Sequence, residues 1–248
     1  MDKKEFIELF KSDASVRARG IWEAQQIAKS CMEALNSYLR PGLSREEIHE
    51  YCAKVMELDG SEAWWIHNDP ALILYGPHTS CSSHDDPSPL FERLKVADND
   101  YVTVDVAPTV SGGWGDLTRS FVIENGSIIP WQDSKNEEIV RGMELEKELH
   151  RAFIGFVDES TTFSELHSFI QEILDRKGYR NCDYHGNFGH TVENDQKDRV
   201  TIIGGENRSI VSYGKPVTFE PHICRLGGSI GIKHENMYVF AGGKMTEV

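Results

Sequence analysis

The chain has 248 residues, of which 39% are hydrophobic, and its formal net charge is −14 at pH 7. This length suits one large domain, or two small ones, with a sizeable core. The negative charge argues against nucleic acid or an anionic membrane as a partner, because both repel an acidic protein. No apolar run approaches the roughly 20 residues of a membrane span, and the charged start lacks the apolar core of a secretion signal.

The cysteines are odd in number, widely scattered and without a C-x-x-C pair. They are Cys31, Cys52, Cys81, Cys182 and Cys224. This pattern is typical of reduced thiols and predicts a cytoplasmic protein.

Helical patterns open the chain. Apolar residues recur with helical spacing over residues 14–39, and Pro41 follows this stretch. Ser44 and Glu47 form a capping-box pattern that starts a second helix, which we expect to end near Leu58. Two short strands and a polar loop are predicted next, at residues 64–66, 71–75 and 76–89.

A hairpin is predicted between Val102 and Ile123. Apolar and polar residues alternate over 102–107, a glycine-bearing turn follows, and a second strand-like run begins at Leu117. Asp105 and Asp116 lie in this apolar context. A buried carboxylate is costly unless it is paired or binds a cation. Two solvent-exposed aspartates on edge strands are the alternative interpretation.

The second half restarts the pattern. We expect helices over residues 135–157 and 164–176, then a segment rich in histidine and glycine at 183–193. Two strands are predicted at the end of the chain, at residues 216–223 and 230–240.

The two halves resemble each other, with boundaries near 14–134 and 135–242. The repeated stretches include VTVDVAP beside VTFEPHI and GDLTRSFV beside KHENMYVF. Glu220 and Glu235 in the second hairpin therefore match the two aspartates of the first. A pseudo-twofold arrangement would bring the four carboxylates together. They cannot all stay ionised in a core without cations, and two divalent ions roughly 3.5–4 Å apart would balance them.

These motifs resemble those of the M24-type pita-bread family of dinuclear metallopeptidases, which includes methionine aminopeptidase, aminopeptidase P and prolidase. The motifs are D-x10-D, the His-Gly and Gly-His pairs of residues 185–190, FEP at 219–221, and IKHE at 232–235. The resemblance implies an α+β fold with a curved antiparallel sheet, a pseudo-twofold repeat and helices on the convex face. In contrast to relatives with an additional N-terminal domain, we expect residues 1–248 to form a single catalytic domain alone.

The resemblance implies a ligand set for two divalent metal ions, which would be Mn, Fe, Co or Zn. Asp105 would bind one ion, His190 and Glu220 the other, and Asp116 and Glu235 would bridge the two.

Catalytic roles are implied for three residues. Glu220 would also shuttle the proton of the attacking water, whereas His84 and His185 would contact the substrate. The spacing from His185 to His190 is one residue longer than is usual in Xaa-Pro enzymes. His190 is the favoured ligand and His185 is the alternative.

Three positions depart from the family pattern. Lys197 stands where the family has a further histidine, Lys233 where Xaa-Pro enzymes have an arginine, and His222 where a glycine usually follows Glu-Pro. The resemblance implies a hydrolase of a C–N bond, of the Xaa-Pro aminopeptidase or dipeptidase type. Because of the departures, a small-molecule amidohydrolase, amidinohydrolase or lyase is the alternative. A non-enzymatic binding module is a further one.

The expected partner is a short-peptide or small-molecule substrate, and a homodimer is compatible with the sequence. Other histidines are expected outside the site. His67, His150 and His167 are interpreted as solvated, and His234 would point away from Glu235 because neighbouring strand residues face opposite sides. Trp114 either shapes the cleft or covers the turn.

Overall fold

The computed structural model describes residues 1–14, 16–64, 69–81, 95–183, 185–195, 198–204, 209, 211 and 214–248. The predictions for His67, His84 and Lys197 lie outside these residues, as does most of the strand predicted at 64–66.

The first half begins with helices. The predicted helix over 14–39 is α2 (Ala18–Tyr38), and the second is α3 (Arg45–Leu58), which begins with the expected capping box of Ser44 and Glu47. A short helix, α1 (Lys3–Leu9), precedes them and was not predicted. Its own capping box, formed by Asp2 and Glu5, was the sequence signal for it. The following elements are β1 (Ala63–Trp64), β2 (Leu72–Tyr75) and the 3-10 helix η1 (Gly76–Ser80).

The first hairpin bends and so belongs to two sheets. Its elements are β3 (Asp100–Val106), β4 (Pro108–Val110), β5 (Gly113–Trp114), β6 (Leu117–Glu124) and β7 (Ser127–Ile129), followed by the 3-10 helix η3 (Trp131–Asp133). β3 and β6 pair in the sheet ordered β2-β3-β6-β7, whereas β4 and β5 pair in the sheet ordered β1-β4-β5. The bend falls at Ala107 on one side and at Gly115 and Asp116 on the other.

The second half repeats this plan. Its elements are α4 (Glu137–Phe156), α5 (Phe163–Lys177), β8 (Tyr179–Asn181), β9 (Val217–Phe219), β10 (His222–Arg225), β11 (Gly231–Lys233), β12 (Asn236–Ala241) and β13 (Lys244–Glu247). The strands expected at 216–223 and 230–240 each break in two. Pro221 explains the first break, because proline has no N–H for the strand ladder. The second break falls at His234 and Glu235.

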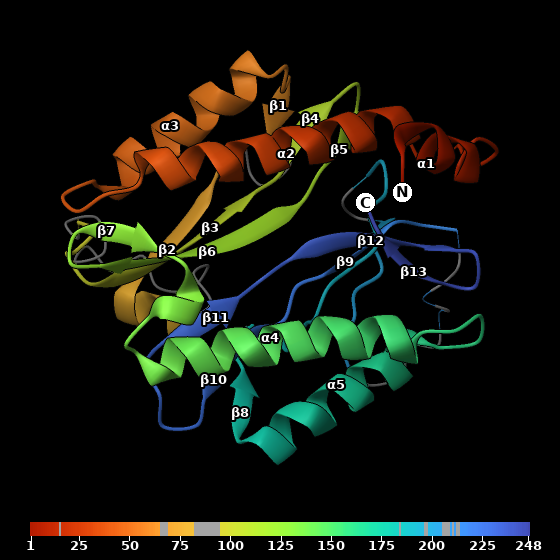
Figure 1. Ribbon diagram of the computed structural model, residues 1–248. Helices are drawn as coiled ribbons and strands as arrows, with labels where there is room; N and C mark the ends of the chain where they lie inside the picture. Colours follow the sequence, from red (N-terminus) through yellow and green to blue (C-terminus); the bar gives the residue numbers. More distant parts are fainter. Residues whose placement is uncertain are drawn as a thin grey trace.

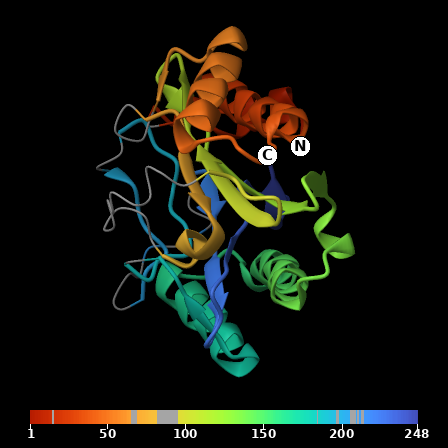
Figure 2. The same ribbon diagram turned by 90° about the vertical axis from the view of Figure 1, so that its left-hand side faces the viewer.

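The internal repeat is visible in the sheet order. The sheet β8-β10-β11 matches β1-β4-β5, and β9-β12-β13 matches β3-β6-β7. Helix α2 packs on β4, β5 and β6, and α4 packs on β10, β11 and β13. In Figure 1 the two helix pairs lie above and below the strands, and in Figure 2 α2 and α4 lie to one side of the central strands. The expected α+β fold with a pseudo-twofold repeat is confirmed.

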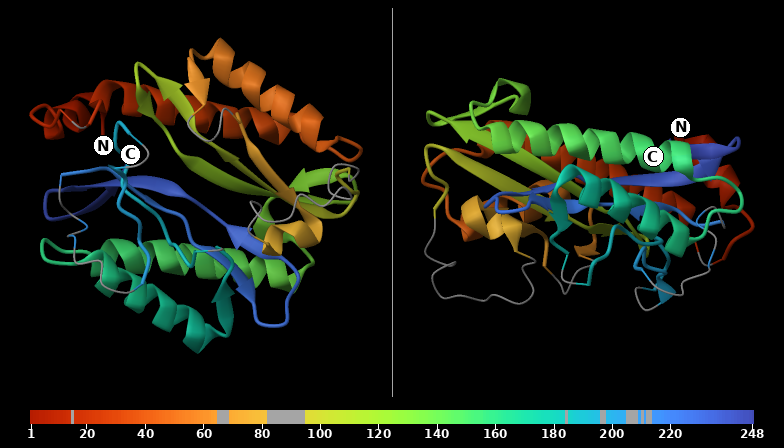
Figure 3. Two further views of the ribbon diagram at one scale, coloured as in Figure 1. Left: turned by 180° about the vertical axis from the view of Figure 1, so that it is seen from behind. Right: turned by 90° about the horizontal axis from the view of Figure 1, so that it is seen from below.

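The core has a large cluster in each half and a third that joins the ends of the chain. In the third, Phe6 of α1 packs with Met237 and Val239 of β12 and with Val248. The two termini accordingly lie side by side in Figures 1 and 3. No helix among the described residues has the combination of length and apolarity that crossing a membrane requires.

Glycines let α2 approach the first hairpin closely. A Cβ atom at Gly20 would lie 2.2 Å from the Val110 carbonyl oxygen, and one at Gly115 would lie 2.7 Å from the Ala24 carbonyl carbon and the Gln25 nitrogen. No side chain fits at these distances. The contact places residue 116, at the bend of the hairpin, against the middle of α2.

Candidate metal centre

Five acidic and imidazole side chains converge between the two halves. Asp116, His190 and Glu235 offer ligand atoms that all lie within 4.8 Å of one another, and so do Asp105, Glu220 and Glu235. These are the five residues predicted as metal ligands from the sequence. The structure therefore brings them together as two groups that share Glu235.

The bends of the two hairpins position the carboxylates. Asp105 is the last but one residue of β3, and Asp116 lies between β5 and β6. Glu220 lies between β9 and β10, and Glu235 lies between β11 and β12. The breaks that divided the predicted strands thus occur where the carboxylates lie, at the pseudo-twofold centre.

Helix α2 fixes the backbone of Asp116. The Gln25 side chain donates a hydrogen bond to the Asp116 carbonyl oxygen (3.1 Å) and accepts one from the Asp116 N–H (2.9 Å). Gln25 is fully buried. It was not predicted as a functional residue, although a polar residue within the apolar stripe of α2 was a signal for it.

Two residues of β6 hold Glu235. The Thr118 hydroxyl donates to Glu235 Oε2 (2.8 Å), and the Glu235 N–H donates to the Thr118 carbonyl oxygen (3.2 Å). The Arg119 guanidinium donates to the Glu235 carbonyl oxygen and to Asn236 Oδ1. Neither Thr118 nor Arg119 was predicted, because their contacts cross from one half of the chain to the other.

The tautomer of His190 suits metal binding. Its Nδ1 lies 3.1 Å from the Thr191 carbonyl oxygen, which can only accept, so Nδ1 carries the hydrogen. The Nε2 lone pair then faces the carboxylates, 3.5 Å from both Asp116 Oδ2 and Glu220 Oε1. The preceding Gly189 has φ +142°, and a Cβ there would lie 2.1 Å from the Thr218 carbonyl oxygen. Only glycine allows this approach to the second hairpin.

Burial and mutual repulsion disfavour ionisation of the clustered acids. Burial first, and then the neighbouring carboxylates, raise the pKa of Asp116 and of Glu235 well above the usual range. Burial also lowers the pKa of His190, so its imidazole is neutral. Asp105 Oδ1 and Glu235 Oε1 are buried without a hydrogen-bond partner. Orphaned carboxylate oxygens beside a neutral imidazole nitrogen form a donor set that fits divalent cations.

A lysine lies inside this cluster. Lys233 Nζ is 2.7 Å from Asp105 Oδ2 and 2.9 Å from Glu220 Oε2. Burial would lower the pKa of Lys233, but Asp105 and Glu220 outweigh it and raise that pKa well above the ordinary value. Burial likewise opposes ionisation of Glu220, yet the charge of Lys233 outweighs it and lowers the pKa of Glu220. Glu220 is therefore an ionised carboxylate at neutral pH.

Of the two histidines predicted to contact substrate, only His185 is among the described residues, and it belongs to neither group. His185 is exposed, and its backbone N–H donates to Asp183 Oδ1. His84 lies outside the described residues. His222, at the position of a family glycine, is buried, and its Nε2 donates to the Thr79 carbonyl oxygen (2.5 Å). Burial lowers its pKa to about 4, and the charge of Lys233 adds to this effect.

Two histidines interpreted as solvated are packed instead, so that prediction was wrong. His150 is buried in α4; its Nε2 donates to the His234 carbonyl oxygen (3.0 Å), and its Nδ1 accepts from the Tyr238 hydroxyl (2.7 Å). Its place in the apolar stripe of α4 was the missed signal. His167 is half-buried and donates to the Gly186 carbonyl oxygen (3.1 Å). His234 faces His150, with ring centroids 5.1 Å apart, on the side away from the centre.

Trp114 both covers the turn and borders the centre. Its side chain is buried, its Nε1 donates to the Glu193 carbonyl oxygen, and its ring centroid lies 5.6 Å from that of His190. The indole thus shields the imidazole from solvent on one side.

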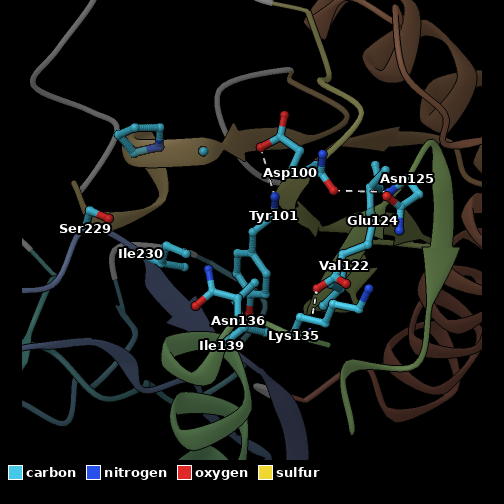
Figure 4. A pocket seen from close by; sticks show the side chains of 14 residues that line it. Asp100, Tyr101, Val122, Glu124, Asn125, Lys135, Asn136, Ile139, Ser229 and Ile230 are labelled. Carbon is cyan, nitrogen blue, oxygen red and sulfur yellow. Dashed lines mark hydrogen bonds between the residues drawn. The ribbon is translucent and has the colours of Figure 1, made fainter. Parts of the chain in front are cut away.

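A separate hollow of about 480 Å³ lies at the other end of β3 and β6. Figure 4 shows Tyr101, Val122 and Ile139 among its apolar side chains and Asp100 and Lys135 among its polar ones. The described residues that line it include none of the five predicted ligands. The hollow is therefore distinct from the metal centre.

The sequence is similar to those of known metallopeptidases and peptidases. The sequence model of Metallopeptidase family M24 matches residues 19–241. An uncharacterized peptidase of Staphylococcus aureus is 24% identical over 216 residues, which are 87% of this chain and 56% of that protein. The chain thus spans about half the length of the curated relatives it matches.

Solved structures share the fold. A recombinant prolidase from Thermococcus sibiricus superposes with a TM-score of 0.75 and 20% identity, covering 98% of this chain and 58% of that one. An X-Pro aminopeptidase from Thermotoga maritima gives a TM-score of 0.75 at 18% identity, covering 92% and 59%. At such identities the likeness shows the fold alone, which is the pita-bread fold expected from the sequence.

Proposed function

The chain belongs to metallopeptidase family M24, and on this premise we propose that it is a metal-dependent hydrolase that cleaves the C–N bond before proline in short peptides. The observation that carries this proposal is the convergence of Asp105, Asp116, His190, Glu220 and Glu235. Similarity to a prolidase and to an X-Pro aminopeptidase supports the Xaa-Pro class.

We propose that the centre holds two divalent ions. The two groups of side chains share Glu235, as expected for a carboxylate that bridges two cations. One imidazole among hard carboxylate ligands suits Mn²⁺, Fe²⁺, Co²⁺ or Zn²⁺, and Mn²⁺ is our choice for the first assays. When bound, the ions would lower the pKa of a water molecule and polarise the scissile carbonyl group.

Glu220 is proposed to move the proton. Its side chain is 16% exposed, whereas those of Asp116 and His190 are each 5% exposed, so Glu220 is the more open of these groups to an incoming substrate. It is ionised at neutral pH because of Lys233, and an ionised carboxylate can accept a proton from the attacking water. The same side chain can then donate that proton to the leaving imino nitrogen of proline.

The catalytic unit is proposed to require both halves of the chain. Asp105 and Asp116 come from the first half, whereas His190, Glu220 and Glu235 come from the second.

We also propose a cytoplasmic location, which is supported by five free cysteines.

The direct test is hydrolysis of Xaa-Pro dipeptides by Mn²⁺-loaded protein, with matching Xaa-Ala dipeptides as comparison substrates. Glu220→Ala and Asp116→Ala are the controls, and we expect each to lose at least about 100-fold in kcat/KM. Equal turnover by the wild type and both variants would overturn the proposal. Full metal occupancy without dipeptide turnover would instead indicate a small-molecule substrate.

A further inference from the structure

Lys233 is paired with only one of the two groups of ligands. Its ammonium contacts Asp105 and Glu220, which together with Glu235 form one group. The amine thus bonds two of the three side chains on which an ion of that group would depend. An ion bound there would depend on the same two carboxylates, and its charge would repel the ammonium.

In the other group, formed by Asp116, His190 and Glu235, the ligand atoms lie within 4.8 Å of one another. His190 Nε2 lies 3.5 Å from Asp116 Oδ2, which is too long for a strong hydrogen bond. Glu235 Oε1, which belongs to both groups, is buried and has no hydrogen-bond partner. The ion pairs of Lys233 do not include Asp116 or His190, so a first cation can bind at these ligands without displacing the amine.

We propose that Lys233 competes with the second metal ion and thereby makes the centre fill in two separate steps. Asp116, His190 and Glu235 would hold the first ion while the ammonium stays with Asp105 and Glu220, so Glu220, the further ligand expected for the His190 ion, would join it only after the ammonium leaves. The second ion binds only when the ammonium leaves those carboxylates. Lys233 acts here through the ligands, as a positioning residue. This inference rests on the proposed metal centre, but it concerns the order of loading rather than the reaction.

The nearby positive charge of Arg199 provides the matched control. Arg199 acts electrostatically on Asp116, His190 and Glu220, as does Lys233. If Lys233 acted only through its charge, removing Arg199 would have a similar effect. If Lys233 occupies the second position, removing Arg199 leaves the two loading steps separate.

The experiment measures bound Mn²⁺ per chain against free Mn²⁺ by equilibrium dialysis and elemental analysis. The proteins are the wild type, Lys233→Met, Lys233→Gln and Arg199→Met. For the wild type and Arg199→Met we expect a second ion that needs roughly 10- to 100-fold more free Mn²⁺ than the first. In both Lys233 variants, the ratio between the free Mn²⁺ concentrations needed for the second and the first ion should fall by roughly 10- to 100-fold.

Electron paramagnetic resonance gives a second readout that does not depend on turnover. At one equivalent of Mn²⁺ the wild type should give the signal of an isolated ion. The Lys233 variants should show the signal of a spin-coupled Mn²⁺ pair at lower free Mn²⁺ than the wild type does. The melting temperature of the Mn²⁺-bound protein verifies that each variant is folded, and Lys233→Gln replaces Lys233→Met if the latter does not fold.

The outcomes separate this inference from the proposed function. The proposed competition by Lys233 would be overturned, and the proposed function left standing, if the Lys233 variants kept the wild-type ratio between the free Mn²⁺ concentrations for the second and first ions. It would also be overturned if Arg199→Met lowered this ratio as much as the Lys233 variants do. Failure of every protein to bind Mn²⁺ would overturn both proposals. The expected loading steps without hydrolysis of Xaa-Pro dipeptides would overturn only the proposed function.

Discussion

Thr118 and Glu235 hydrogen-bond to each other twice across the pseudo-twofold centre, although 117 positions separate them in the chain. One bond, from the Thr118 hydroxyl, orients Glu235 Oε2. The other joins the two backbones. The carboxylate shared by both groups of ligands is therefore held by the opposite half of the molecule.

We expect Thr118→Val to weaken Mn²⁺ binding by roughly tenfold, because it removes the donor that orients Glu235 while keeping the side-chain shape. Thr118→Ser retains the hydroxyl and should bind Mn²⁺ nearly as the wild type does. Dialysis of both variants against Mn²⁺ is the measurement. Wild-type affinity in Thr118→Val would show that this hydrogen bond does not matter for the centre.

Gln25→Leu should destabilise the protein by about 2–5 kcal/mol. The substitution leaves the buried N–H and carbonyl of Asp116 without partners, and each unsatisfied group costs about 1–3 kcal/mol. Asn36→Ala, on an exposed turn of the same helix, should cost less than about 1 kcal/mol. Urea unfolding gives both free energies, and similar values for the two variants would contradict the expectation.

Gly115→Ala and Gly155→Ala form a matched pair that should change the free energy of unfolding in opposite directions. A Cβ at Gly115 would lie 2.7 Å from the backbone of α2, whereas a Cβ at Gly155 meets nothing within 4 Å. We expect the first change to cost more than about 2 kcal/mol and the second, inside α4, to stabilise by up to about 1 kcal/mol. Thermal and urea unfolding measure both. If Gly115→Ala left the free energy of unfolding unchanged, the hairpin would be able to move away from α2 without loss of stability.

Glu146 gives a prediction about pH. Both of its carboxylate oxygens are buried without a partner, and burial raises its pKa well above the usual range, with Lys233 opposing this. The folded state therefore keeps the acid protonated where the unfolded chain is ionised. Its contribution to stability is present below the unfolded pKa of about 4.5 and is lost as the pH rises toward the folded pKa.

Glu146→Met removes this penalty, so the variant should gain stability over the wild type as the pH rises from 5 to 8. The gain grows by at most about 1.4 kcal/mol per pH unit. Glu144→Met, on the exposed face of the same helix, is the control for the loss of a glutamate from α4. Urea unfolding at three pH values in constant chelator tests this, and a difference that stays constant with pH would contradict it.

The fold was largely predictable because its helices obey local rules. The capping box at Ser44 predicted the start of α3, and the helix predicted over 164–176 matches α5 within one residue at each end. The breaks in the second hairpin were not predicted. The one at Pro221 had a local signal, whereas the one at His234 and Glu235 depends on pairing with distant strands. The prediction for His150 was wrong although a local signal existed, namely its position in the apolar stripe of α4.

The ligands of the centre were predictable from motifs, but their support was not. Asp105 and Glu220 stand at equivalent positions of the repeat, so their convergence follows from the pseudo-twofold axis. The contacts of Gln25, Thr118 and Lys233 depend on which side chains meet when the halves pack together. Periodicity within one segment contains no information about that packing.

The division of the ligands between the halves has a kinetic consequence. Neither half alone offers both Asp116 and His190, so metal can bind strongly only after the halves have packed together. A cation of this kind stabilises the native state without helping a half-formed intermediate. Mn²⁺ should therefore slow unfolding and leave the refolding rate nearly unchanged, which stopped-flow measurements with and without the ion can determine.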